Sequence, residues 1–379
     1  MPRQLTATTD LDERYMARAL KLAEGGRGYV EPNPLVGCVL VRNGRILAEG
    51  LHRRFGAAHA EVDALLRCTG SPKRATAYVT LEPCAHQGKT PPCADALVAA
   101  GIARVVVPST DPNPAVAGRG LRRLRRAGIQ VDVGVLRKPA RQLNAPFFKL
   151  CRDGMPYVML KWAQSLDGKI ATRTGQSQWI TAAPARREAH RLRGRVDAVL
   201  VGVGTVLADD PALTCRHVKP RRIAARVVVD THLRTPTRAR LVTTAADTPT
   251  MIFTARTTFE KSPRRVRTLE RAGVEVVDLP TRQGRIDLRR ALLWMGKQPW
   301  TSILVEGGGG LLGAFLDADL ADEAHVFVAP RLIGGSAAPG PLGGTGPTDV
   351  GGLDHAKLTR SRRVGPDTLH HFLIRAENV

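Results

Sequence analysis

The chain has 379 residues, more than a single hydrophobic core usually organises, and this length predicts two domains. Hydrophobic residues make up 43% and aromatic residues only 4%, a composition that suits a globular α/β enzyme and argues against a fibrous or disordered chain. No apolar run is long enough to span a bilayer, and the first residues lack the apolar stretch of a secretory signal. We therefore expect a cytoplasmic protein without a membrane partner.

The formal net charge of +23 admits two interpretations. Clustered lysine and arginine can neutralise the phosphates of a nucleic acid. The 57 basic residues are, however, spread over both halves of the chain, where helical spacing would leave them on solvated faces. We favour a compositional bias together with small anionic ligands, and we expect no nucleic-acid partner.

The first 135 residues alternate between helical and strand patterns. Residues 12–24 have apolar side chains at helical spacing, and Asn43-Gly44 predicts a β-hairpin over residues 36–50 because this dipeptide readily adopts left-handed conformations. Further helices are predicted over 59–68 and 91–102, and further strands over 76–83 and 103–112.

Residues 137–156 lose this alternation, and their basic residues, prolines and Asp153-Gly154 turn predict a linker. We accordingly expect one domain over residues 1–150 and a second over residues 151–379. In the second domain the sequence predicts strands over 156–165, 196–206, 225–233, 250–255, 274–279, 302–308 and 323–332. The glycine-rich stretch 334–346 is expected to be a loop.

A metal site is indicated in the first domain. The six cysteines, at 38, 68, 84, 93, 151 and 215, are too sparse for a disulfide framework, so a clustered pair points to metal binding or catalysis. His59, Cys84 and Cys93 offer three ligands, which would leave one position of a zinc ion open to water. Glu61 follows His59 by two residues and could move a proton between that water and a leaving amine.

Taken singly, His59 could be a core histidine and each cysteine an ordinary buried thiol. Together, His-x-Glu, Pro-Cys and a second cysteine match the signature of zinc-dependent deaminases, in which the glutamate is the general acid and base. Eight residues separate the two cysteines instead of two. The longer segment contains His86 and Lys89, and it could capture a substrate phosphate or simply be a solvated loop.

Long strings of residues resemble a known family. They are PNPLVG at 32–37, HAEV at 59–62, VTLEPCAHQGKTPPC at 79–93, DPNPAVAGRG at 111–120, SLDGKIA at 165–171, SQWIT at 177–181, TVLADDPALT at 205–214 and VEGGGGLLGAF at 305–315. The resemblance is to the bifunctional riboflavin-biosynthesis proteins, in which a diaminohydroxyphosphoribosylaminopyrimidine deaminase is joined to a 5-amino-6-(5-phosphoribosylamino)uracil reductase. It covers nearly the whole chain.

The resemblance implies an α/β fold, with a cytidine-deaminase-like three-layer domain followed by a dihydrofolate-reductase-like domain. It implies zinc on His59, Cys84 and Cys93, with Glu61 as the proton shuttle. It also implies substrate contacts near Asn33, His52, His86 and Lys89. Glu31, Ala85 and Gln87 depart from the family's pattern, which bears on the fine contacts of this pocket.

The second half contains a glycine string, Gly308-x-Gly310-x-x-Gly313, with the spacing of a dinucleotide fingerprint. A Rossmann domain would require an acidic residue at the end of the next strand, and that strand ends in Ala329-Pro330. The spacing therefore predicts only that backbone N–H groups at a helix start can approach a phosphate, or that the segment is a tight strand-to-helix turn.

For this half the resemblance implies an NADPH-dependent reductase. The cofactor contacts that it implies are Ala163, Trp179, Thr205, Asp209, Gly308, Gly309, Gly310, Leu311, Leu312, Gly313 and Ala314. The substrate contacts are Ser177, Arg193, Leu213, Arg216 and Glu306, with Lys161 reaching the sugar and Asp209 between cofactor and substrate. Plain alternatives remain: Arg193 and Arg216 as surface charges, Trp179 as a core aromatic, and Asp210 in place of Asp209.

The resulting hypothesis is a bifunctional enzyme with zinc and NADPH as cofactors and phosphoribosyl pyrimidines as substrates, assembled as a homo-oligomer, a dimer or tetramer. One rival is a nucleic-acid base deaminase with an accessory C-terminal domain. Another is a binding module with a structural zinc, which would need a fourth ligand such as His86.

Overall fold

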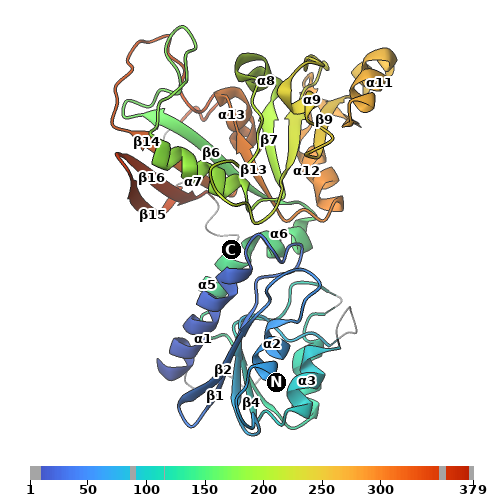
Figure 1. Ribbon diagram of the computed structural model, residues 1–379, viewed down its shortest axis with the longest axis vertical. Coiled ribbons are helices and arrows are strands. Elements are labelled where there is room, and N and C mark those ends of the chain that lie inside the picture. Colours follow the sequence, from blue (N-terminus) through green and yellow to red (C-terminus); the bar gives the residue numbers. More distant parts are fainter. Residues whose placement is uncertain (1–9, 86–90, 115, 350–355, 375–379) are drawn as a thin grey trace. The chain divides into compact units, whose positions relative to one another are not determined.

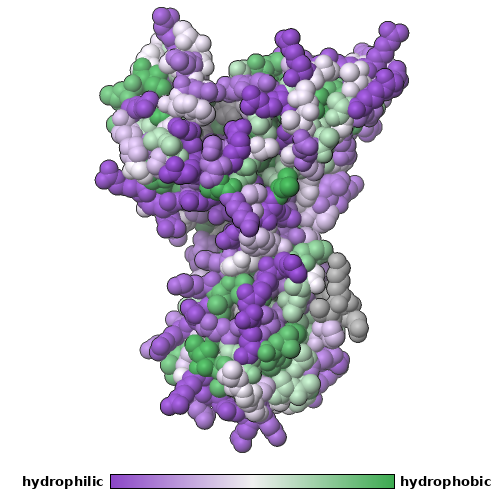
Figure 2. Space-filling model, in the orientation of Figure 1, coloured by the Kyte–Doolittle hydropathy of each residue, from purple (hydrophilic) through white to green (hydrophobic). Residues whose placement is uncertain are grey.

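The computed structural model describes residues 10–85, 91–114, 116–349 and 356–374. The chain divides between Asp153 and Gly154 into two compact units, each with its own sheet and its own core (Figure 1). Figure 2 shows hydrophilic residues over the visible face of both units rather than in one stripe, as expected for charge that is spread along the chain.

The sheet of the first unit has the order β2-β1-β3-β4-β5. Strand β1 pairs antiparallel with β2 and β3, whereas β3, β4 and β5 are parallel. Asn43 and Gly44 both have positive φ, 50° and 73°, which confirms the predicted hairpin between β1 and β2. The strands are β1 (Gly37–Arg42), β2 (Arg45–Leu51), β3 (Thr76–Val79), β4 (Arg104–Val107) and β5 (Gln130–Val133).

Helices cover both faces of this sheet. Alternate residues of β1 face opposite sides, so that Cys38 and Leu40 pack in the core with α2, α3 and α4, and Val39 and Val41 pack against α1. This confirms the three-layer fold expected for the first domain. The helices are α1 (Asp10–Ala23), the 3₁₀ helix η1 (Glu24–Gly26), α2 (Ala60–Leu66), α3 (Cys93–Ala99), α4 (Arg119–Arg126), α5 (Arg137–Leu143) and α6 (Ala145–Asp153).

The predicted linker over residues 137–156 is wrong, because most of this segment forms α5 and α6. Pro139 and Pro146 fall in the first turns of these helices, where a missing N–H group costs little. Between the helices lies Asn144, which is buried. Its side chain accepts a hydrogen bond from Leu35 N at 2.7 Å and donates one to Leu35 O at 2.9 Å. The segment is therefore tied into the first unit.

The second unit is built on a sheet with the order β10-β9-β8-β7-β13-β6-β14-β16-β15. It is parallel from β10 to β14, and β16 and β15 continue it antiparallel. The strands are β6 (Tyr157–Ser165), β7 (Ala198–Gly202), β8 (Ala225–Val229), β9 (Thr250–Ala255), β10 (Val274–Leu279), β13 (Ser302–Glu306), β14 (Glu323–Ala329), β15 (Lys357–Val364) and β16 (Asp367–Leu373). A separate hairpin consists of β11 (Thr281–Arg282) and β12 (Arg285–Ile286).

Helices cover this sheet as well, and the expected dihydrofolate-reductase-like α/β class is confirmed. The predicted strand over 196–206 is correct only in its first half, because the chain turns into a helix after Gly202. The helices are α7 (Ala183–Arg193), α8 (Val203–Asp209), α9 (Arg240–Thr243), α10 (Arg256–Lys261), α11 (Pro263–Arg271), α12 (Leu288–Lys297) and α13 (Gly309–Asp317). Among the residues that the structure describes, no helix has the length and apolarity needed to cross a membrane.

A buried ionic cluster joins α1 to the sheet of the first unit. Asp12 is 3% exposed and accepts hydrogen bonds from both terminal nitrogens of Arg104, at 2.8 and 2.9 Å, and from the Tyr78 hydroxyl at 2.7 Å. The helix, β3 and β4 meet at this one carboxylate, and the half-buried Arg104 guanidinium also donates from Nε to Asp132 Oδ2 at 2.6 Å.

We predict that Asp12→Ala lowers the free energy of unfolding of the first unit by about 2 kcal/mol, because the hydrogen bonds of a buried carboxylate to Arg104 and Tyr78 are lost while Arg104 keeps Asp132. The matched control is Glu13→Ala, at the neighbouring exposed position, which should change it by less than about 0.5 kcal/mol. Urea unfolding of the full chain measures both. Equal effects of the two substitutions would contradict the assigned role of Asp12.

Candidate functional site

Three predicted metal ligands converge where two helices of the first unit begin. His59 precedes α2, Cys93 is the first residue of α3, and Cys84 lies on the segment that follows β3. His59 Nδ1 lies 3.2 Å from Cys93 Sγ and 3.6 Å from Cys84 Sγ. Ligands that share a tetrahedral zinc ion at roughly 2.0–2.3 Å are separated by similar distances. Two sulfurs and one imidazole nitrogen therefore fit a zinc ion.

The protonation states around this cluster suit metal binding and proton transfer. A hydrogen bond from Cys93, joined by one from His59, lowers the pKa of Cys84 to about 4 against the opposing effect of burial, whereas the same contact with Cys84, together with burial, raises the pKa of Cys93. Burial is the main cause that raises the pKa of Glu61 to about 7, and the charge on Cys84 adds to it. Cys84 is thus a thiolate, and Glu61 can take up and release a proton near neutral pH.

Asn33 and His52 lie beside the metal ligands. His52 Nε2 is 3.1 Å from Asn33 Nδ2, and His52 Nδ1 is 3.0 Å from the carbonyl oxygen of Ala58. The two contacts together fix His52 as a neutral ring that donates from Nδ1 and accepts at Nε2, and burial lowers its pKa accordingly. Its ring packs edge-on against that of His59 at 5.2 Å. The predicted contacts His86 and Lys89, like Gln87, lie outside the described residues.

The sequence analysis missed Glu82, which holds the cysteine-bearing segment in place. Its buried carboxylate accepts hydrogen bonds from the backbone N–H groups of Asp111 and Gly118, and from those of Gly120 and Leu121 at the start of α4, at 2.8–3.3 Å. A Cβ atom on Gly120 would lie 1.8 Å from Pro83 O, so only glycine fits there. The two family strings around residues 82 and 111–120 are thereby packed together next to Cys84.

A second group of possible metal ligands, Glu323, His325 and His371, lies on β14 and β16. Both imidazole Nε2 atoms approach the same Glu323 oxygen, at 2.5 and 2.8 Å. These are hydrogen-bond lengths, shorter than the separations of about 3 Å or more between ligands of one ion. Although burial opposes it, His325 holds the pKa of Glu323 well below its ordinary value. The cluster is a half-buried carboxylate that is hydrogen-bonded to His325 and has the His371 ring close beside it.

The second unit brings three predicted site residues together at the end of β13. Glu306 is 6% exposed and pairs with Arg193 through two contacts of 2.7 and 2.9 Å, while the Lys161 ammonium lies 3.4 Å from Glu306 Oε2. Burial alone would raise the pKa of Glu306, but Arg193 and Lys161 hold it well below its ordinary value. Arg193 is therefore part of a buried cluster and not a solvated surface charge.

Of the other predicted substrate contacts, Arg216 lies near enough to Arg193 for their charges to interact. Arg216 is exposed; burial and the nearby charge of Arg193 lower its pKa. Such mutual repulsion between two guanidiniums favours an anion between them. Leu213 is buried with φ of 53°, and Ser177 is half-buried on the segment between β6 and α7.

The glycine turn after β13 meets the start of α8. The backbone N–H of Gly308 donates to Thr205 Oγ1 at 3.4 Å, and Gly307 has φ of 122°. Gly309 and Gly313 pack closely against residues 340–344. The side chain of Leu312 is fully buried in the core, so this side chain cannot contact a ligand. Cβ atoms on Gly308 and Gly310 would instead point into open space.

A groove of about 500 Å³ begins at this turn. It is lined by Gly310, Leu311 and Ala314 of α13, by Gly202, Val203 and Gly204 after β7, by Val229, Thr231, His232 and Arg234 at the end of β8, and by residues 283–286 and Leu288. The groove lies at the carboxyl ends of parallel strands, where ligands of open α/β sheets bind. Its glycines and the N-terminus of α13 suit a phosphate-bearing nucleotide.

The remaining predicted cofactor contacts differ in their surroundings. Trp179 is 60% exposed and stacks under Arg186, whose guanidinium lies 4.5 Å from the ring centre, so it is not a core aromatic. Asp210 accepts a hydrogen bond from Arg240 N at 2.7 Å, whereas Asp209 is exposed at the end of α8. Ala163 is half-buried on β6, beside Phe327 of β14.

Comparison with known proteins accounts for both units. A family model described as the cytidine and deoxycytidylate deaminase zinc-binding region matches residues 9–109, and one described as the RibD C-terminal domain matches residues 156–370. The riboflavin biosynthesis protein RibD of Escherichia coli (strain K12) is 46% identical over 376 residues, which cover 96% of this chain and 99% of that protein. RibD of Actinobacillus pleuropneumoniae is 42% identical, over 97% of this chain and 96% of that protein.

Solved structures agree over the same length. A diaminohydroxyphosphoribosylaminopyrimidine deaminase/5-amino-6-(5-phosphoribosylamino)uracil reductase from Thermotoga maritima matches with a TM-score of 0.82 at 34% identity, covering 96% of this chain and 98% of that one. Form 1 of Acinetobacter baumannii RibD matches with a TM-score of 0.81 at 35% identity and the same coverage. The chain therefore belongs to the RibD family, the bifunctional deaminases and reductases of riboflavin biosynthesis, which use zinc and NADPH.

Proposed function

We propose that residues 1–150 carry the deaminase and residues 151–379 the reductase, with one active site in each. The observation that carries this proposal is the convergence of His59, Cys84 and Cys93 beside the buried carboxyl group of Glu61. The substrate of the first site is a 2,5-diamino-6-ribosylamino-pyrimidinone 5′-phosphate. Its deaminated product is the substrate of the second site.

In the first site, His59, Cys84 and Cys93 would hold a zinc ion, which would supply Lewis-acid activation of water. Glu61 would take a proton from the water whose oxygen bonds to the amidine carbon and deliver it to the amine, so that the C–N bond breaks and ammonia leaves. Asn33 and His52 orient the pyrimidine; their mutual hydrogen bond at 3.1 Å supports a fixed geometry. We assign the substrate phosphate to His86 and Lys89.

In the second site, NADPH supplies the hydride that reduces C1′ of the ring-opened ribosyl group. We assign the cofactor to the groove at the glycine turn. Ala163, Trp179 and Asp209 would contact it on the side of the substrate. The other proposed cofactor contacts are Thr205, Gly308, Gly309, Gly310, Leu311, Leu312, Gly313 and Ala314. The ammonium of Lys161, kept in place by the ionised Glu306, reaches the sugar at C1′. Arg193 and Arg216, with Ser177 and Leu213, bind the phosphoribosyl group.

We further propose a homo-oligomer, a dimer or tetramer, located in the cytoplasm. Leu166 and Leu332, which are 65% and 76% exposed, support an interface because they lie on adjoining loops: Leu166 N donates to Arg331 O at 2.8 Å. Cys84 and Cys93 can bind a metal only as free thiols or thiolates. Such cysteines persist in a reducing compartment, which supports the cytoplasm as the location. Light scattering of the purified protein measures its assembly.

The proposed function predicts two activities in a fixed order. Given the diamino-pyrimidinone phosphate, the purified protein should release ammonia first and then oxidise NADPH, followed at two wavelengths. A zinc chelator should abolish ammonia release and leave NADPH oxidation intact when the aminouracil product is supplied directly. Ammonia release without NADPH oxidation of the supplied product would contradict the reductase assignment.

Glu61→Gln should reduce ammonia release by about 10²–10⁴-fold, because proton transfer by a positioned carboxyl group contributes this much. It should leave one zinc ion per chain, measured by elemental analysis, since Glu61 is not a ligand. The matched variant Cys84→Ser should lose the zinc itself. Retained deaminase activity in Glu61→Gln would contradict the assigned role.

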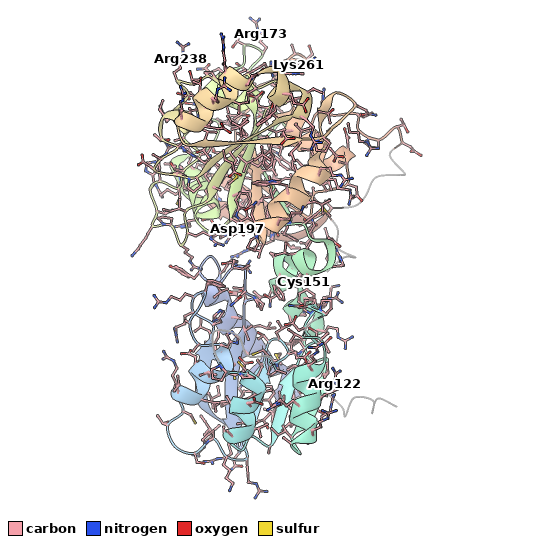
Figure 3. All side chains as sticks on the ribbon, turned by 90° about the vertical axis from the view of Figure 1, so that its right-hand side faces the viewer. Arg122, Cys151, Arg173, Asp197, Arg238 and Lys261 are labelled. Carbon is pink, nitrogen blue, oxygen red and sulfur yellow. The ribbon has the colours of Figure 1, made fainter. Side chains whose placement is uncertain are left out.

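Lys161→Met should lower the rate of NADPH oxidation with the aminouracil substrate by about 10²-fold or more, because the cation beside the reacting carbon is lost. Lys261→Met is the matched control, since Lys261 lies on α10 at the outer edge of the second unit (Figure 3) and should leave this rate unchanged. Ammonia release should be unaffected in both variants. Equal rates for both variants would rule out the assigned role of Lys161.

A further inference from the structure

Helix α7 holds the segment that carries Arg216. His190 of α7 is 8% exposed, and its Nδ1 accepts a hydrogen bond from Arg216 N at 3.1 Å. The thiol of Cys215 donates to His190 O at 3.0 Å. Arg193, also on α7, donates from Nη1 to Thr214 O at 3.3 Å. Three successive residues of the segment are therefore each bound to the second half of α7.

The contact with Arg216 N fixes the protonation state of the His190 ring. A backbone N–H can only donate, so Nδ1 accepts and the neutral ring carries its proton on Nε2. Burial, followed by the charges of Arg193 and Arg216, lowers the pKa of His190 to about 4. The Thr214 carbonyl group, 3.2 Å from Nδ1, opposes this effect. His217, whose ring packs edge-on at 5.3 Å, adds to it. At neutral pH the lone pair of Nδ1 is thus available to Arg216 N.

The segment has a backbone that requires such support. Leu213 and His217, at its two ends, have positive φ of 53° and 64°, a region that is unfavourable for residues with a Cβ atom. Gly194, directly after α7, lets the segment approach, because a Cβ atom there would lie 2.9 Å from Cys215 Sγ. The guanidinium of Arg216 remains exposed. Helix α7 thus fixes the backbone of Arg216 and leaves its side chain open to a ligand.

Electrostatic repulsion would otherwise drive Arg216 away from this position. Arg193 is paired with Glu306, and its charge still lowers the pKa of Arg216, after the larger effect of burial. Among the described residues, no carboxylate pairs with Arg216. Arg216 is therefore the guanidinium that is left for an anionic group of the substrate, and the contacts with α7 offset the repulsion until that anion binds.

We infer that His190 is a positioning residue of the reductase site, which fixes the backbone at Arg216 so that the guanidinium meets the 5′-phosphate of the substrate. This inference rests on the proposed function, in which Arg216 binds the phosphoribosyl group. His190 does not touch the substrate and acts on a phosphate ester only through Arg216. Because a guanidinium that is already in place binds an anion at a lower cost in ordering, His190 contributes to substrate affinity and not to hydride transfer.

Steady-state reduction of the aminouracil 5′-phosphate, and of the same compound without its phosphate, tests this role in the full chain. His190→Phe keeps a ring but removes the acceptor, and it should raise KM for the phosphate ester by about fivefold or more. The kcat, the KM for NADPH and the KM for the dephosphorylated compound should stay within about twofold. His190→Asn, whose Oδ1 can accept in place of Nδ1, should restore KM for the phosphate ester to within about twofold of the unchanged chain.

A double-mutant cycle shows whether His190 acts through Arg216. Arg216→Ala should itself raise KM for the phosphate ester, and adding His190→Phe to it should raise KM no further. Arg187→Ala, at an exposed position of α7, is the matched control and should leave every constant unchanged.

Equal KM values for His190→Phe and His190→Asn, a fall in kcat, or a loss shared by the dephosphorylated compound would overturn the inference, because a merely structural histidine gives these results. If Arg216→Ala leaves KM for the phosphate ester unchanged, the proposed function of Arg216 fails instead, and the role of His190 with it.

Discussion

Parallel β-strands place many of the candidate site residues of this protein, because the loops that follow such strands all emerge at one edge of a sheet. In the first unit, Glu82 and Cys84 follow β3, and Asp111 follows β4. In the second, α8, Asp230 and Glu306 stand at the ends of β7, β8 and β13. Residues that are far apart in the chain are thereby brought into one site without any long connection.

Buried carboxylates then fix these loops. Glu82 accepts four backbone N–H groups, and Asp230 holds the turn to Thr235. Each compensates the cost of its own burial through hydrogen bonds to its charged form. In a chain with a formal net charge of +23, buried carboxylates such as these add no negative charge to the surface, where most of the arginines lie.

Local patterns in the sequence were sufficient to predict much of the structure. The hairpin at Asn43-Gly44, most strands and the convergence of His59 with the two cysteines follow from periodicity and from a metal-ligand motif. The linker over 137–156 was mispredicted because its helices depend on tertiary contacts such as that of Asn144 with Leu35, 109 residues away. Glu82 was missed for the same reason, since its partners lie 29–39 residues further along the chain. No sequence motif marks Arg234 and Arg285, which line the groove at the glycine turn.

Each unit closes its own core and contains its own cluster of site residues, with the division between Asp153 and Gly154. Substitutions in different cores that share no contacts have nearly additive effects on stability. Over evolutionary time, either half can accordingly accumulate changes, exchange its specificity or even lose its activity without a compensating change in the other. Two consecutive steps encoded in one chain are coupled in their expression but remain free to diverge in their chemistry.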